Sequence, residues 1–178
     1  MTAVKTFSGL QFEVRREGAN DMALVADFWR HVSRTNLPAR YVGVVDPSDP
    51  EACASQAHEG RTSTFLAFGG DKAIICIAML VSDVEHRSAR VMAFTRDGIT
   101  SHGVSWALLE YVLAEAQKDG ILAVTSVLSL EDAPAVRLER KMGFVEADYP
   151  GNASYRLLRW TFGERVGATA PFAPEGWS

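Results

Sequence analysis

Residues Val91–Leu109, VMAFTRDGITSHGVSWALL, combine three kinds of local structure in one stretch. The first five residues are apolar strand formers, and a polar turn containing Gly98 follows them. From Gly103 onward apolar residues recur at helical spacing, which predicts a helix over 103–118. The N–H groups of a first helical turn have no partner within the helix, and the helix dipole adds partial positive charge there. A strand, a polar turn and a helix in this order can therefore bind a phosphate group.

The apolar patterning on either side of this stretch predicts the remaining elements. Strands are expected over 10–15, 62–68, 72–81, 89–95, 121–128, a short stretch from Phe144, and 154–162. Helices are expected over 21–33, 103–118 and 133–142, with a short one over 51–59. The early strands are joined by hairpins and the later ones by helices, which predicts an α/β (α+β) fold. Its central mixed sheet should have six to seven strands, with helices on both faces.

Two of these elements carry a more specific expectation about burial. The run 73–81 is almost entirely apolar, which predicts a central strand buried on both faces. In the helix over 133–142, the spacing of Ala135, Leu138 and Met142 predicts the buried stripe.

Length and composition limit the class of protein. The 178 residues fit one domain, which we assign to residues 1–162, followed by a loosely attached tail over 163–178. The net charge of −4 argues against nucleic acid as the main partner, because binding to a duplex needs a basic face. The N-terminus has no signal-peptide pattern, and no apolar run approaches the roughly 20 residues that span a bilayer, so we expect a cytoplasmic protein without a membrane partner. The spacing of Cys53, Cys76 and the histidines predicts no metal site.

The order of the expected elements resembles that of the GNAT superfamily of N-acetyltransferases. The phosphate-binding turn of that family, Gln/Arg-x-x-Gly-x-Gly/Ala, corresponds here to Thr100–Ser105, TSHGVS. The second family element is an Asn followed by a short helix and Gly-Phe, and it corresponds to the stretch from Asp132 to Phe144. Segments 32–41, 95–97 and 137–144 resemble more closely the protein-acetyltransferase-like branch, and the likeness covers about residues 10 to 160.

The resemblance implies acetyl-CoA or another acyl-CoA as co-substrate. The residues that match the family's binding positions come from the end of one strand, the turn, the start of the helix and the second helix cap: Ala93, Phe94, Thr95, Thr100, Ser101, His102, Gly103, Val104, Ser105 and Asp132. In this family a main-chain N–H of the strand, here near 93–95, usually polarises the thioester carbonyl.

Several positions depart from the family pattern. Thr100 replaces Gln or Arg, and Ser105 replaces Gly or Ala. Glu139 stands where many members have a Tyr general acid, and Arg90 stands where the branch often has a Glu base. Arg90 is interpreted as a surface strand residue or as a contact for an acidic substrate. Polar residues that could move a proton are Asp83, Glu85, Ser129, Glu131 and Glu139; each also fits a solvated loop or helix, and the sequence does not choose among them.

Two functional interpretations follow from the resemblance. The first is an acyl-CoA-dependent N-acyltransferase that moves an acyl group to a small amine or a protein lysine by direct transfer in a ternary complex. The alternative is a catalytically degenerate GNAT-fold module that binds CoA or a partner for regulation, which the altered turn and the missing Tyr and Glu favour. A P-loop nucleotide enzyme is a poor fit, because no Gly-Lys-Ser/Thr follows a Gly-rich loop. The acceptor, the acyl chain length and the formation of a homodimer stay open.

Overall fold

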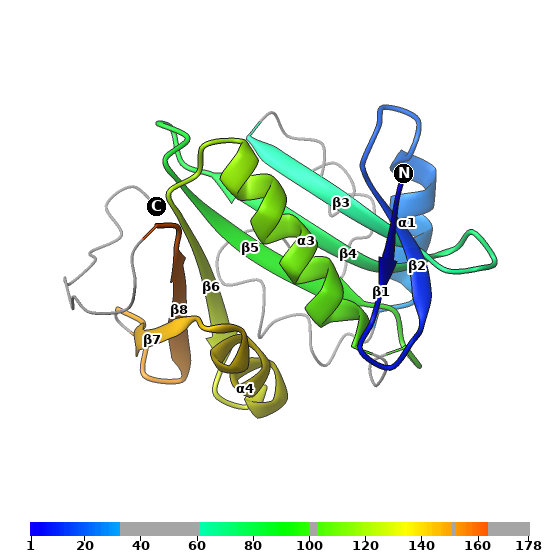
Figure 1. Cartoon of the computed structure of the whole chain (residues 1–178). Helices are drawn as coiled ribbons and strands as arrows, with labels where there is room; N and C mark the ends of the chain where they lie inside the picture. Colours follow the sequence, from blue (N-terminus) through cyan, green and yellow to red (C-terminus); the bar gives the residue numbers. More distant parts are fainter. Residues whose placement is uncertain (33–60, 100–102, 151, 164–178) are drawn as a thin grey trace.

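The main element of the structure is one mixed sheet (Figure 1). The computed structural model describes residues 1–32, 61–99, 103–150 and 152–163, and within them the sheet has eight strands in the order β1-β2-β3-β4-β5-β6-β8-β7. The strands are β1 Thr2–Lys5, β2 Gln11–Arg16, β3 Thr62–Phe68, β4 Ile74–Ser82, β5 Ser88–Thr95, β6 Ala123–Ser129, β7 Val145–Asp148 and β8 Tyr155–Thr161. The helices are α1 Met22–Arg30, α3 Val104–Lys118 and α4 Ala133–Met142.

The predicted mixed sheet is confirmed, but it has eight strands where six to seven were predicted. The missed strand is β1, which pairs antiparallel with β2 at the edge of the sheet. Its residues are exposed or half-buried, so the sequence carries no buried-face alternation there. The expected short helix over 51–59 and the tail from residue 164 lie outside the described residues.

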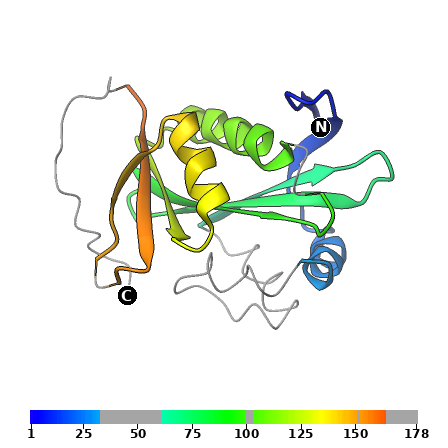
Figure 2. The same cartoon turned by 90° about the horizontal axis from the view of Figure 1, so that it is seen from below.

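Helices cover both faces of the sheet, as predicted (Figure 2). On one face α3 and α4 pack against the strands, and the buried side chains there include Leu108 and Val136. On the other face α1 contributes Phe28 and Trp29 to a second cluster with Phe94 of β5. Strand β4 is buried from Ile74 to Leu80 and serves both clusters, which confirms the prediction of a central strand buried on both sides.

The central strands β5 and β6 are paired over only part of their length. They are the parallel neighbours of the sheet, and their register pairs are Ser88↔Ala123, Ala89↔Val124 and Arg90↔Thr125. Within the described residues β5 continues for five residues beyond Arg90 and β6 for four beyond Thr125 without further pairs between them. The two strands therefore part in the direction of α3 and α4, whose N-termini follow these strand ends.

The C-terminus of α4 depends on a glycine that serves two requirements at once. Gly143 has a left-handed φ of 108°, and a Cβ atom at this position would lie 3.1 Å from Cζ3 of Trp160. Gly120, which follows α3, also has a positive φ, 81°, but a Cβ there would meet no atom within 4 Å. A comparison of Gly143 with Gly120 therefore separates the effect of the positive φ from the effect of crowding against Trp160.

We predict that Gly143→Ala lowers the free energy of unfolding more than Gly120→Ala. Both substitutions carry the strain of a positive φ, about 1–3 kcal/mol, and only the first also crowds the Trp160 ring. Urea denaturation of the two variants measures the difference, and an equal or larger loss in Gly120→Ala would contradict it.

Candidate functional site

The junction between β5 and α3 is held by main-chain geometry and side-chain hydroxyls. Gly103 caps α3 with a left-handed φ of 73°, a conformation that favours glycine. Thr95 Oγ1 and Ser105 Oγ are 2.7 Å apart and share a hydrogen bond, and Cys76 Sγ on β4 lies 3.5 Å from Thr95 Oγ1. The Ser105 hydroxyl therefore ties the first turn of α3 to the end of β5.

The N-terminus of α3 has no side-chain cap. Its first-turn amides, those of Val104, Ser105 and Trp106, have no acceptor within the helix. Within the described part of the chain no side chain accepts a hydrogen bond from them. The helix runs for 15 residues, so its dipole is fully developed at this end. This end of α3 can therefore offer several N–H donors to an anion.

The turn that enters α3 is anchored from the opposite face of the sheet. The Asp97 amide donates to the carbonyl of His31, directly after α1, over 3.1 Å. Arg96 Nη1 lies 4.0 Å from Asp27 Oδ2 on α1. The Arg96 amide also donates to the Ile75 carbonyl of β4. The start of the turn is thus fixed to both α1 and β4.

The sequence-predicted binding residues lie close together where they are described. Ala93, Phe94 and Thr95 end β5, and Gly103, Val104 and Ser105 begin α3. Thr100, Ser101 and His102 lie outside the described residues. Asp132 is confirmed as the cap of α4, because its Oδ1 accepts from the Ala135 amide at 3.3 Å.

A buried carboxylate distinguishes α4. The predicted stripe of Ala135, Leu138 and Met142 is confirmed only in part: Ala135 and Met142 are half-buried and pack against the core, whereas the fully buried residues of the helix are Val136 and Glu139. Apolar spacing could not identify the inner face in full, because a residue of a charged type, Glu139, also lies on it. Glu139 is 7% exposed, and its Oε1 accepts a 3.0 Å hydrogen bond from the Ser126 hydroxyl of β6.

Sequence reasoning missed Ser126. It is the first residue of β6 beyond the last pair with β5, and it is 2% exposed. Side chains of Val124 and Leu128 lie in the cluster with α3 and α4, so alternation places Ser126 on the same face. A hydroxyl residue on the inward side of β6, between the apolar Val124 and Leu128, was the signal that could have identified it.

The other proton-transfer candidates lie at the ends of strands. Ser129 ends β6, is buried, and its Oγ accepts from the amide of the exposed Glu131 at 3.2 Å. Exposed Glu85 lies in the turn between β4 and β5, at the opposite end of β5 from Thr95. The structure does not bring Glu85 together with the junction at α3.

Asp83 is a hydrogen-bonded turn residue. Burial raises the pKa of Asp83, but hydrogen bonds from the Ser88 hydroxyl and from the Arg87 and Ser88 amides outweigh this effect and lower the pKa below its ordinary value of 3.8. A carboxylate stabilised in its charged form by the turn is a weak proton acceptor. Asp83 therefore closes the β4–β5 turn.

Arg90 is buried, at 9% exposure, so the interpretation as a surface strand residue is wrong. Its neighbours in register are Val81 of β4 and Thr125 of β6. Met92 and Phe94, two and four residues further, belong to the cluster with α1, so Arg90 lies on that face of the sheet. The sequence could not show this, because a single Arg in a strand carries no information about what covers it.

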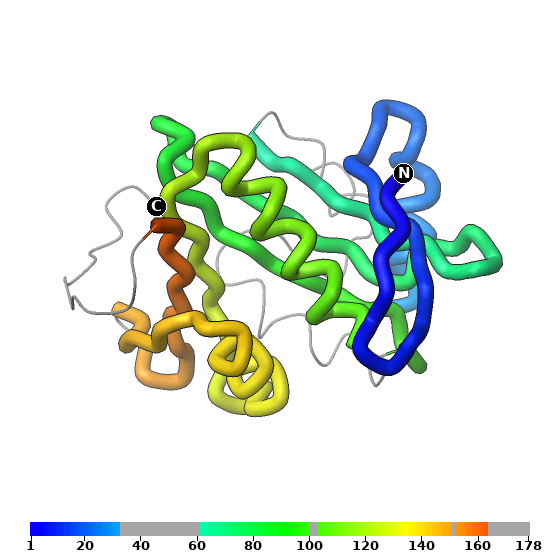
Figure 3. The backbone as a smooth tube through the Cα atoms, in the orientation of Figure 1, coloured from blue at the N-terminus to red at the C-terminus, as the bar shows by residue number. Residues whose placement is uncertain are grey.

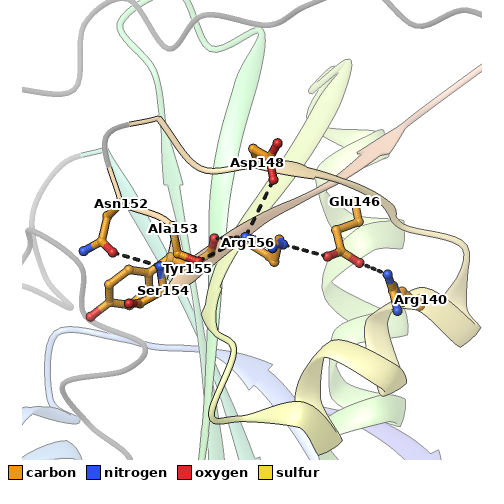
Figure 4. A network of polar contacts seen from close by, with 8 residues as sticks. All are labelled: Arg140, Glu146, Asp148, Asn152, Ala153, Ser154, Tyr155 and Arg156. Atoms are coloured by element: carbon orange, nitrogen blue, oxygen red, sulfur yellow. Dashed lines mark hydrogen bonds and ion pairs between the residues drawn. The ribbon is translucent and has the colours of Figure 1, made fainter.

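An ion-pair network fixes the hairpin that follows α4 (Figure 4). Glu146 of β7 pairs with Arg140 of α4 and with Arg156 of β8, whose Nε lies 3.1 Å from Glu146 Oε1. Arg156 Nη1 also lies 3.6 Å from Asp148. These contacts join α4 to β7 and β8, and so help to hold α4 and Glu139 against β6.

A groove of about 640 Å³ runs between α3, α4 and β8. Its apolar lining includes Trp106, Leu113, Met142, Trp160 and Phe162. Neither the end of β5 nor Ser105 lines it. The groove therefore reaches the first turn of α3 at Trp106 but does not include the end of β5.

Two further features bear on the kind of site. In the described part of the chain, no group of three or more His, Cys, Asp or Glu residues could hold a metal ion. No helix in the described ranges is long and apolar enough to cross a membrane.

The fold is that of the GNAT N-acetyltransferases, as the resemblance predicted. The GNAT domain of S. lividans PAT matches with a TM-score of 0.79 at 17% identity, over 90% of this chain and 96% of that one. A GNAT-family acetyltransferase from Streptococcus pneumoniae matches with a TM-score of 0.65 at 18% identity, over 85% and 99% of the two chains. A spermidine N-acetyltransferase SpeG chimera from Vibrio cholerae and hSSAT matches with a TM-score of 0.64 at 15% identity, over 84% and 95%.

Comparison of the sequence alone found no further relative. No family model matches the chain, and no curated protein matches it. Similarity is therefore visible in the fold and not in the overall sequence.

We predict that Asp83→Asn lowers the free energy of unfolding at neutral pH and that this loss fades in acid. Because the folded-state pKa is lowered, the carboxylate contributes stability above pH 3.8 and loses it as the pH falls through the folded-state value. Denaturant unfolding at pH 7 and at about pH 3 measures the loss of unfolding free energy under both conditions. Asp71→Asn, at another turn carboxylate that accepts an amide bond, is the control. A deficit of equal size at both pH values would contradict the charge-based explanation.

Proposed function

We propose that the protein is an acyl-CoA-dependent N-acyltransferase, with acetyl-CoA as the acyl donor. The observation that carries the proposal is the uncapped N-terminus of α3 beside the point where β5 and β6 part, within a GNAT fold. The amides of Val104 to Trp106 would bind the diphosphate of CoA. The acyl-bearing arm would lie along the end of β5, between the parting strands.

The transfer needs an amine, a polarised carbonyl and a proton for the leaving group. The amine nitrogen attacks the thioester carbon, the C–N bond forms and the C–S bond breaks, and the amine releases one proton while the thiolate takes up one. The main chain of Ala93–Thr95 lies beyond the last pair with β6 and would polarise the carbonyl oxygen. The acceptor would be a small amine or a protein lysine, and the reaction a direct transfer in a ternary complex.

Glu139 is the residue we assign to the proton of the leaving thiol. Its carboxyl group is bonded to Ser126, which is the first residue after the β5–β6 pairs. An acid–base group would thus lie on the α4 side of the parting strands, while Ser129 and Glu131 remain weaker candidates for the base that accepts the amine proton. We assign no single residue to that second role.

A first experiment tests the diphosphate site. We expect CoA and acetyl-CoA to bind in calorimetric titration and Ser105→Asp to weaken CoA binding about tenfold or more, because its carboxylate would add a negative charge close to the diphosphate. The same charge is favourable at a helix N-terminus, so the fold should persist. Ser105→Asn also changes the hydroxyl but adds no charge, and it serves as the matched control.

Two outcomes would count against this site. Failure of the wild-type chain to bind CoA at millimolar concentration contradicts the proposed function. Equal affinity in Ser105→Asp and Ser105→Asn contradicts the placement of the diphosphate.

A second experiment tests Glu139. We expect Glu139→Gln to lower kcat by about 10²- to 10⁴-fold with little change in the KM for acetyl-CoA, because proton transfer is lost while CoA binding is kept. Thiol release with spermidine, phosphinothricin and a lysine peptide as acceptors measures the rate. Glu131→Gln, at an exposed carboxylate before the same helix, is the control. An unchanged kcat in Glu139→Gln, or an equal loss in the control, would contradict the assignment.

The alternative is a GNAT-fold module that binds CoA without turning it over. The observations that favour it are Glu139 in place of a Tyr and the buried Arg90 in place of a Glu. Binding of CoA with no thiol release for any acceptor in the panel would support this alternative.

A further inference from the structure

An exposed aromatic ring lies directly against the start of α3. Phe7, in the turn between β1 and β2, is 81% exposed, which is high for a large apolar side chain. A Cβ atom placed on Gly103 would lie 2.9 Å and 3.0 Å from Cδ1 and Cζ of Phe7, and closer still to Cε1. Figure 3 shows this hairpin turn beside the first turn of α3.

The turn that carries Phe7 is fixed by its own hydrogen bonds. The Thr6 amide donates to the Leu10 carbonyl at 2.9 Å, and the Gly9 amide donates to the Thr6 carbonyl at 3.0 Å. The Thr6 hydroxyl accepts from the Leu10 amide at 3.1 Å and bonds to Ser8 Oγ at 2.8 Å. Thr6 itself is buried, at 4% exposure. The exposed position of Phe7 is therefore a stable feature of the hairpin.

Contact with Gly103 accounts for only part of the ring. One edge of Phe7 lies on the glycine, and most of the ring surface still faces solvent. Gly103 is also the residue from which the uncapped α3 begins. A flat apolar surface thus adjoins the set of amides to which we assigned a diphosphate.

We propose that Phe7 forms a stacking site for the adenine base of the acyl-CoA, an inference that rests on the proposed function. In CoA the diphosphate is linked on one side to the pantetheine arm and on the other to an adenosine. If the pantetheine arm lies along β5, the adenosine extends from the diphosphate in the other direction, away from β5. The Phe7 ring beside Gly103 lies there. Stacking of a base on an aromatic face is a sequence-independent interaction that needs no hydrogen-bond partner.

The test compares two ligands that differ in the adenosine. CoA and 4′-phosphopantetheine are titrated into the full chain and into Phe7→Leu and Phe7→Trp. We expect Phe7→Leu, which keeps an apolar side chain without a π face, to weaken CoA binding about five- to 150-fold. The affinity for 4′-phosphopantetheine should stay the same, and Phe7→Trp should keep the affinity for CoA.

A control variant and the thermal midpoint separate stacking from a structural role. Leu10→Ala changes an apolar residue of the same turn, 38% exposed, and should leave both affinities unchanged. Equal weakening of both ligands in Phe7→Leu, with a lowered melting temperature, would overturn the inference and leave Phe7 as a support for Gly103. Unchanged CoA binding in Phe7→Leu would also overturn it while the proposed function stands. A wild-type chain that binds neither ligand would contradict the proposed function itself.

Discussion

The parallel pairing between β5 and β6 is the constraint on which the site depends. Three register pairs join the strands, and the strands then part toward the helices that follow them. A parallel pair needs a crossover, and here α3 provides it on one face of the sheet. The N-terminus of α3, the end of β5 and the buried face of α4 consequently lie around the point where the two strands part.

The start of α3 is held by the rest of the molecule and not by a capping side chain. The Thr95–Ser105 hydrogen bond joins it to β5, and the bond from Asp97 to His31 joins the preceding turn to α1. These contacts use hydroxyl groups and carbonyls around the helix start and leave its first amides directed at the turn. The position of this helix start is therefore set by contacts with β5 and α1 that do not occupy its own amides.

The residues that depart from the family pattern have different structural roles. Ser105 is directed to Thr95, so its hydroxyl strengthens the junction. Glu139 occupies the inner face of α4 and meets Ser126, so the replacement of a Tyr leaves an ionisable group at this place. Arg90 is buried on the opposite face, where it shares a register row with Thr125. Ser105 and Glu139, two of the residues that depart from the family pattern, thus each form a hydrogen bond with a hydroxyl group of a neighbouring strand.

The sequence by itself determined the type and approximate limits of the central elements, from the strand before Thr95 to the helix that Gly143 ends. Hydrophobic periodicity and terminal residues are local properties, so they were sufficient for the mixed sheet, the two-sided β4 and the Asp132 cap. The exposed β1 carried no such periodicity and was missed. The inward position of Glu139, its bond to Ser126 and the contact of Phe7 with Gly103 were decided by the tertiary structure alone. Each of them joins residues from different elements, and their proximity arises only when the strands are ordered in the sheet and the helices pack upon it.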